Sequence, residues 1–263
     1  MSVNALRHFL LALQFFTRVP VTGRLAAWVG YSPQMLRASA AHFPGVGWIV
    51  GGVAAAVFAL ASQGLPPLAA ALLSTVATVW LTGAFHEDGL ADVADGLGGS
   101  AQRERALEIM KDSRIGAFGA IALVLALALK VALLAALAAQ GVSAVVAGLF
   151  AGHVLSRLAP LFLIRFLPYV GESGASKSKP LADAIGGGAL VVGVFWSIPA
   201  VAPVLLAQGA MKTGAMVWAV AAAGAWMARL FRRRLQGFTG DGLGATQQVC
   251  ELAIYLVLAW TWA

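Results

Sequence analysis

The sequence is poor in charged residues and contains a single cysteine. Only 11% of its 263 residues are Asp, Glu, Lys or Arg, whereas soluble domains carry about 25%. Hydrophobic residues make up 60% and the mean hydropathy is +0.84, which excludes a soluble domain and a disordered chain. Cys250 stands alone, which excludes an internal disulfide and a cysteine-based metal site. The sequence therefore predicts an integral membrane protein.

Seven apolar runs are long enough to cross a bilayer, which takes about 20 residues of helix. They cover residues 43–62, 67–85, 117–139, 142–168, 185–208, 213–231 and 246–262. The fourth run contains His153, Arg157 and Arg165, so we expect it to tilt, kink or leave the bilayer early. The N-terminal run, 4–16, is too short to span and predicts an interfacial helix. The fold class is thus an all-α, polytopic membrane helical bundle, and residues 1–263 form one domain.

The basic residues orient this bundle. Fourteen of the 18 Lys and Arg residues lie in or at the edge of the segments 1–42, 86–116, 169–184 and 232–245, and among the opposite turns only Lys212 is basic. Because cytoplasmic loops of membrane proteins carry excess Lys and Arg, we expect a cytoplasmic N-terminus. The net charge of +7 has the same origin, so no nucleic-acid partner is expected. No small-residue cleavage site follows the first apolar stretch, so we expect no cleavable signal peptide.

The acidic residues lie on the same side. Ten of the 11 Asp and Glu residues fall in the cytoplasmic segments, and only Glu251 lies within a predicted span. The positive-inside rule explains basic residues but says little about acidic ones. We therefore expect a functional site that faces the cytoplasm.

The densest acidic segment covers residues 86–96. In a helix, Asp88, Asp92 and Asp95 fall on one stripe, because each residue rotates by about 100°. Like charges at this spacing destabilise a helix, so a cation must offset them. Carboxylate oxygens are typical ligands of Mg²⁺, with Mn²⁺ as the alternative. Zinc is less favoured because no Cys or His residues are clustered here. A solvated helix end explains one or two acids but not three on a stripe.

Two nearby features complete this interpretation. Glu87 lies off the stripe and is expected to support the metal from beside it. Gly89 and Gly96 are small enough for a ligand or a neighbouring helix to approach closely.

Basic side chains that could hold phosphate follow shortly after. Arg114 can bind phosphate oxygens in pairs and Lys111 can supply a point charge. A positive flank of the next span explains both residues equally well, although it does not require Asp112 between them. The glycine-rich segment 238–246 carries Asp241 and either cradles a diphosphate, adds a metal ligand or forms a flexible turn.

Other charged residues remain open between a functional and a structural role. Lys177 and Lys179 either close over an anionic substrate or belong to a plain polar loop. Arg157 lies in the inner half of its span and is expected to reach the site, because ionisable groups inside spans are usually functional. Lys130 is expected to pair with Glu251 between helices.

Four segments together resemble the cobalamin synthase family, the adenosylcobinamide-GDP ribazoletransferases. They are residues 13–20 (LQFFTRVP), 86–96 (HEDGLADVADG), 108–119 (EIMKDSRIGAFG) and 240–245 (GDGLGA). The second and third segments are the most specific, and the resemblance covers most of the chain.

The resemblance implies a multi-pass enzyme of the cell inner membrane that uses Mg²⁺. It would join adenosylcobinamide-GDP to α-ribazole, or to its 5′-phosphate, and release GMP. The family's acidic signature falls on Glu87, Asp88, Asp92 and Asp95. The chemistry is also similar to that of CDP-alcohol phosphotransferases, although the Ala-Arg pair that follows their first Asp-Gly is absent here.

These arguments give one set of predicted site residues. Asp88, Asp92, Asp95 and Glu87 are expected to bind metal; Lys111 and Arg114 to stabilise the leaving group; Glu87 or Asp112 to accept the proton; and Arg18, Arg157, Lys177, Lys179 and Asp241 to bind substrates. Further partners are membrane lipids. Gly47 and Gly51 would allow close helix packing within one chain or between copies in a homo-oligomer.

Two other functions compete with this one. A CDP-alcohol-type membrane phosphotransferase would use the same metal chemistry on another acceptor. A transporter would explain Lys130, His153 and Arg157 within spans, but it would need polar groups that continue across the membrane.

Overall fold

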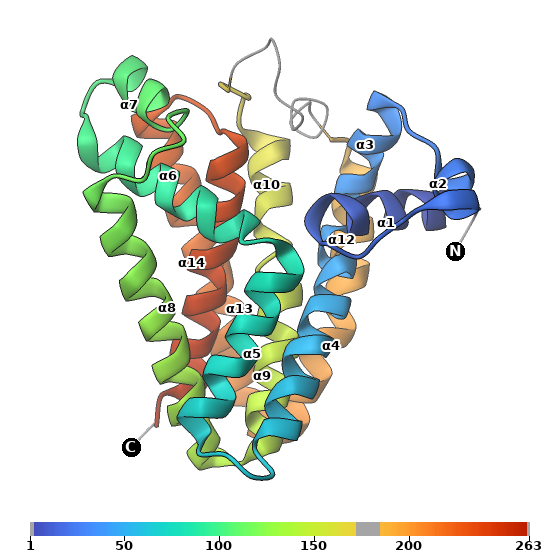
Figure 1. Ribbon diagram of the computed structural model, residues 1–263, viewed down its shortest axis with the longest axis vertical. Helices are drawn as coiled ribbons and strands as arrows, with labels where there is room; N and C mark the ends of the chain where they lie inside the picture. The colour runs from blue at the N-terminus through green and yellow to red at the C-terminus, as the bar shows by residue number, and fades with distance from the viewer. Residues whose placement is uncertain (1–2, 172–184, 262–263) are drawn as a thin grey trace.

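The computed structural model describes residues 3–171 and 185–261, and within these ranges the chain forms helices and turns but no strand (Figure 1). In chain order the helices are α1 (Val3–Phe16), α2 (Gly23–Val29), α3 (Pro33–Ser39), η1 (Ala40–His42), α4 (Phe43–Ala61), α5 (Pro67–Thr82), α6 (Phe85–Gly99), α7 (Arg103–Ile109), α8 (Ala117–Leu137), η2 (Ala138–Gln140), α9 (Val142–Leu155), α10 (Ala159–Phe166), α12 (Gly187–Ser197), η3 (Ile198–Ala200), α13 (Val201–Arg234) and α14 (Gly240–Ala259). The all-α fold class is confirmed.

The long helices run side by side along the longest axis of the molecule (Figure 1). Among the described residues, five helical segments are long and apolar enough to cross a membrane, or six if α5 and α6 form one bent span. The chain is therefore a multi-pass membrane protein, but the predicted number of seven spans is not confirmed. One segment, Gly187–Arg234, is 48 residues long and corresponds to two predicted spans. Its helical geometry breaks at Gly209, between them.

The fourth predicted span is broken, as its polar content suggested. Helix α9 ends at Leu155 and α10 begins at Ala159, with tight turns over Ser156–Leu158 between them. Pro160 lies in the first turn of α10, where its missing N–H removes one bond of a continuous helix. The break places Arg157 inside the bundle, where α14 packs against both α9 and α10.

The acidic segment forms a helix of its own. Helix α5 ends at Gly83 and Ala84, both with positive φ, and α6 leaves at an angle of 89° to α5. Helices α6 and α7 lie at the same end of the molecule as α1, α2 and α3 (Figure 1). The predicted N-terminal helix is confirmed, and α1 lies across the axis of the bundle in this view.

Small residues bring the helices together within the chain. A Cβ atom on Gly51 would lie 3.1 Å from Cα of Phe150, and one on Gly47 would clash with the backbone of His153. Gly47 and Gly51 therefore serve the packing of α4 against α9. The expectation of close small-residue packing is met within one chain, and a homo-oligomer stays a prediction.

Candidate active site

The first turns of α6 and α14 form the acidic end of the bundle. Gly89 on α6 faces the backbone of Asp241 so closely that a Cβ atom there would lie 2.7 Å from the Asp241 carbonyl oxygen. Gly244 approaches the backbone of His86 in the same way. The glycines of the segment 86–96 thus admit a neighbouring helix. The segment 240–245, expected as a loop, is instead the beginning of α14, and the Thr239 hydroxyl accepts a hydrogen bond from the Gly242 N–H at its N-cap.

This packing brings three carboxylates near one another. Asp92 lies within electrostatic reach of Asp241, Asp88 and, more weakly, Asp95, and Asp241 lies within reach of Asp88. We call Asp88, Asp92 and Asp241 the carboxylate cluster. Asp88 is exposed and the other two are half-buried, so ligands can reach the cluster.

The carboxylate cluster lacks protein cations. Within residues 3–171 and 185–261, no Lys, Arg or His side chain forms an ion pair with Asp88, Asp92 or Asp241. The three carboxylates repel one another, and a bound divalent cation would offset this repulsion because its preferred ligands are carboxylate oxygens. In the same part of the chain, however, no three His, Cys, Asp or Glu side chains are gathered closely enough to form a ready-made metal centre. Metal binding thus stays a prediction.

Asp95 is turned toward α8 rather than toward the carboxylate cluster. Its two carboxylate oxygens accept hydrogen bonds from the backbone N–H groups of Gly116, at 2.7 Å, and Gly119, at 2.8 Å. A carboxylate at this position satisfies unpaired N–H groups and interacts favourably with the positive end of the helix. A side chain on either glycine would clash with Asp95. Asp95 therefore joins α6 to α8, and its role as a metal ligand stays a prediction.

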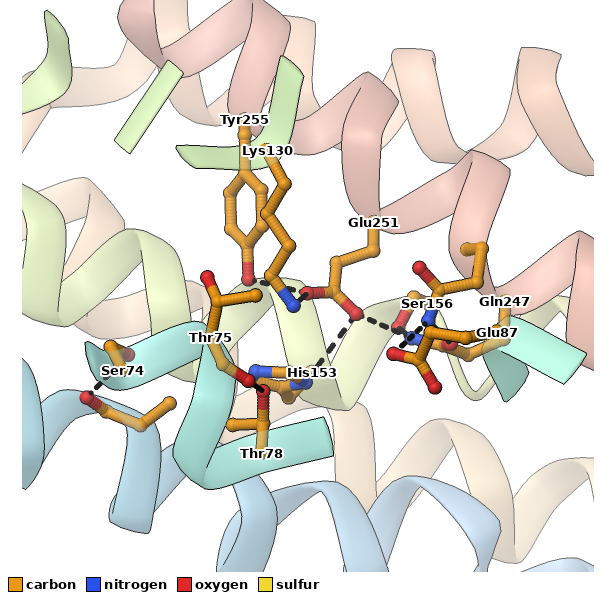
Figure 2. A network of polar contacts seen from close by, with 12 residues as sticks. Ser74, Thr75, Thr78, Glu87, Lys130, His153, Ser156, Gln247, Glu251 and Tyr255 are labelled. Atoms are coloured by element: carbon orange, nitrogen blue, oxygen red, sulfur yellow. Dashed lines mark hydrogen bonds and ion pairs between the residues drawn. The ribbon is translucent and has the colours of Figure 1, made fainter. Parts of the chain in front are cut away.

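Glu87 points into the interior of the bundle. Its side chain is buried, and Oε1 accepts a hydrogen bond of 3.0 Å from Gln248 on α14 while Oε2 has no partner. The Gln248 amide also donates to the Gln247 side chain. Glu87 thus links the acidic helix α6 to a buried polar network (Figure 2).

The centre of this network is Glu251. Lys130 Nζ lies 2.7 Å from Glu251 Oε1, and both side chains are about 98% buried within the bundle, with exposed fractions of 3% and 2%. The Tyr255 hydroxyl donates to Oε1 and the Gln247 amide to Oε2, at 2.9 and 2.6 Å (Figure 2). His153 Nδ1 lies 3.4 Å from Oε2. The predicted Lys130–Glu251 pair is confirmed.

Arg157 lies beside this network and lines a small cavity. The cavity has a volume of about 30 Å³ and is bordered by His86, Gln247 and Gly240. Arg157 Nη1 donates a 2.8 Å hydrogen bond to the His153 carbonyl oxygen, whereas Nε has no partner. Arg157 therefore reaches the neighbourhood of Asp241, the residue after Gly240, from within the bundle.

The predicted phosphate-binding segment after α7 forms an ion pair of its own. Arg114 pairs with Asp112 at 2.6 Å; Arg114 is exposed and Asp112 is half-buried. The hydrogen bonds from Arg114 lower the pKa of Asp112 to about 2, which makes Asp112 a weak proton acceptor. Lys111 has an interaction partner as well, and the ion pair of Arg114 is with Asp112 rather than with Asp88 or Asp92.

The remaining predicted residues fall elsewhere. Arg18 is exposed and lies against Gly83, where its backbone N–H donates to the Leu81 carbonyl oxygen. This position is the bend between α5 and α6, and Arg18 lines a separate groove between α5 and α8. Lys177 and Lys179 lie outside the described residues.

The uncharged polar residues of α14 that take part in the buried polar network were not predicted from the sequence. Gln247, Gln248 and Tyr255 connect Glu251 to Glu87 and to the hydroxyl of Ser156. Their signal was present, because Gln247, Glu251 and Tyr255 recur at a spacing of four in an apolar helix and so share one face.

The fold and the site together define a class of protein, a multi-pass helical membrane protein. Its carboxylates and the buried Arg157 lie where the acidic helix α6 meets the start of α14. The model of the family described as cobalamin-5-phosphate synthase (CobS) matches residues 8–259. The chain belongs to this family.

Individual relatives agree over nearly the full length. The chain is 61% identical to the adenosylcobinamide-GDP ribazoletransferase of Albidiferax ferrireducens, covering 97% of this chain and 98% of the relative. It is 60% identical to the protein of the same name from Polaromonas naphthalenivorans, with the same coverage, and 46% identical to that of Shewanella amazonensis, covering 97% and 95%. The protein is thus an enzyme of cobalamin biosynthesis, a transferase. No solved structure gives a significant match.

Proposed function

We propose that the protein transfers the phosphocobinamide part of adenosylcobinamide-GDP to α-ribazole, or to α-ribazole 5′-phosphate, and releases GMP. The observation that supports this reaction most directly is the carboxylate cluster, in a chain 61% identical to a ribazoletransferase. The cluster is open to ligands and has no basic partner among the described residues. A transfer between a diphosphate and a hydroxyl acceptor needs a site that neutralises and orients phosphate oxygens. We expect this site to face the cytoplasm from the inner membrane.

Asp88, Asp92 and Asp241 are the residues that would hold Mg²⁺. When bound, the metal would neutralise the diphosphate and stabilise the charge that develops on the leaving phosphate. We leave Asp95 out of this set because α8 already engages both of its oxygens. Asp241 replaces it, since Asp241 is the acid that α14 brings beside Asp92.

The chain's own groups would then position the reacting atoms. The ribose hydroxyl of α-ribazole attacks the phosphorus atom bonded to cobinamide; a new P–O bond forms and the bond to GMP breaks. Of the two carboxylates predicted to accept the hydroxyl proton, Asp112 is a weak acceptor because Arg114 holds it ionised. Glu87 keeps one oxygen without a partner and is the better candidate. Arg157 is the buried cation next to Gly240 and would attract the phosphate.

The test is release of GMP by purified protein in liposomes, given adenosylcobinamide-GDP and α-ribazole. We expect release to need both the acceptor and Mg²⁺, and to stop when EDTA is added. GMP release without acceptor would show hydrolysis and contradict the proposed transfer. CMP release from a CDP-alcohol, with no GMP release, would favour the lipid-type phosphotransferase instead.

A matched pair of variants tests the metal ligands. Asp92→Asn is expected to lower activity by about 100-fold or more, because one charged ligand at the reacting phosphate is lost, while the thermal unfolding of the protein stays close to that of the wild type. Asp95→Asn, on the same helix, is expected to lower the unfolding temperature but leave the Mg²⁺ concentration for half-maximal activity unchanged. Near-normal turnover of Asp92→Asn, or a shifted Mg²⁺ requirement in Asp95→Asn, would contradict this assignment.

A further inference from the structure

A groove of about 1070 Å³ lies between the N-terminal helices and the acidic end of the bundle. Its walls come from α1, α2, α3 and the linker at Gly30 and Tyr31, and from the beginnings of α6 and α14. Asp241, a member of the carboxylate cluster, lines one side of it. We call this space the N-terminal groove. It lies beside the carboxylate cluster and is large enough for a bulky substrate.

The size and the lining of the groove indicate which part of the substrates it can bind. Ligand pockets usually measure about 300–1,000 Å³, so this groove suits a ligand at or above the upper end. Leu11, Phe15, Leu36 and Phe85 make its walls largely apolar. The polar groups are contributed by Gln14, Tyr31 and Asp241, and none of the described residues that line the groove is Lys or Arg.

These properties fit a macrocycle better than a nucleotide. A diphosphate would need basic side chains, which the described part of the lining does not contain, and a nucleoside would fill only part of the volume. The corrin ring of cobinamide is a broad, largely apolar plate with amide groups around its edge. Apolar walls can cover such a plate while Gln14 and Tyr31 hydrogen-bond to the amides. We propose that the N-terminal groove binds the corrin ring of the donor, with its diphosphate directed toward Asp241 and the carboxylate cluster.

The N-terminal helices are held firmly enough to form such a wall. Arg7 Nε donates a 2.9 Å hydrogen bond to the Val29 carbonyl oxygen, which ties α1 to the end of α2. Phe15 of α1 packs edge-on against Phe85 of α6, with 5.7 Å between ring centroids. This contact fixes the wall of the groove relative to the helix that carries Asp88 and Asp92.

The test uses two neighbouring alanines of α2. Ala26 is half-buried and lines the groove, whereas Ala27 is exposed and does not. Ala26→Trp is expected to fill the groove and raise the KM for adenosylcobinamide-GDP at least tenfold, with the KM for α-ribazole changed less than twofold. Ala27→Trp introduces the same side chain on the same helix and is expected to match the wild type.

A second measurement does not need turnover. Equilibrium dialysis of adenosylcobinamide, which lacks GDP, against proteoliposomes is followed by the absorbance of the corrin ring. Wild type and Ala27→Trp are expected to retain it, and Ala26→Trp to retain at least tenfold less. If Ala26→Trp does not fold, Tyr31→Ala, an exposed residue of the groove wall, is expected to weaken retention in the same direction.

The outcomes separate this inference from the proposed function on which it rests. Absence of GMP release by the wild type would contradict the proposed function, while the dialysis would still decide what the groove binds. Unchanged retention and unchanged donor KM in folded Ala26→Trp would overturn the assignment of the groove. A rise in the KM for α-ribazole alone would overturn it as well.

Discussion

At the scale of single residues, the chain separates its carboxylates by their partners. Asp88, Asp92 and Asp241 have no basic partner in the part of the chain that the structure describes, whereas Glu251 has Lys130 and Asp95 has two backbone N–H groups. Acidic residues that are alike in the sequence therefore have different roles in the structure. Those with partners hold helices together, and those without are available to a ligand.

The Lys130–Glu251 pair predicts a large loss of stability when it is broken. Glu251→Gln leaves the Lys130 ammonium group buried without its carboxylate, and breaking a buried pair in this way costs about 3–5 kcal/mol. The double variant Lys130→Met/Glu251→Gln is expected to lose less than the sum of the two single variants, because it removes both charges. Denaturant unfolding in detergent measures the cycle. Additive losses would show that the pair does not contribute as a unit.

At the scale of elements, breaks in the helices decide where the chemistry lies. The bend between α5 and α6 turns an acidic segment across the end of the bundle, and the break between α9 and α10 brings Arg157 beside the start of α14. A third break, at Gly209, lets the segment 187–234 change direction at the end of the molecule away from the acids.

Gly209 predicts a contrast between two glycines of α13. Its φ of +81° and ψ of 174° are accessible to glycine but strained for other residues, so Gly209→Ala is expected to cost about 1–3 kcal/mol. Gly214 lies in regular helix with open space around it, so Gly214→Ala is expected to gain about 0.5–1 kcal/mol from helix propensity. Thermal unfolding in detergent compares the two. Equal effects would mean that the break is not set by the backbone of Gly209.

At the scale of the whole molecule, the two ends of the bundle differ in chemistry. One end carries α1–α3, α6 and α7 with their charged residues, whereas the other is formed by short turns (Figure 1). At that second end Lys212 donates to the Gln140 side chain and the Leu258 carbonyl oxygen. The asymmetry agrees with a site that opens on one side of a membrane.

Single cysteines test this orientation. Cys250 is buried, so the natural chain has little background reactivity. Gln63→Cys, in the turn after α4, is expected to react with a membrane-impermeant maleimide in intact spheroplasts. Gln102→Cys, just before α7, is expected to react only after permeabilisation, because the excess of basic residues predicts that this end of the bundle faces the cytoplasm. The reverse pattern would place the carboxylate cluster outside the cell.

The sequence by itself determined the membrane class, the helical content and the acidic segment, because hydropathy and helical spacing are local properties. The Lys130–Glu251 pair was also predicted, since Glu251 is the one acid inside the predicted spans and a charge buried there needs an opposite partner. It did not determine which acids lie together. Asp95 shares a stripe with Asp92 but faces α8, and Asp241 comes from a helix about 150 residues away. Only the close approach of α6 to α14 and α8, through residues such as Gly89 and Gly119, decided those neighbours. Long-range packing of this kind depends on how helix surfaces fit together, which no local pattern specifies.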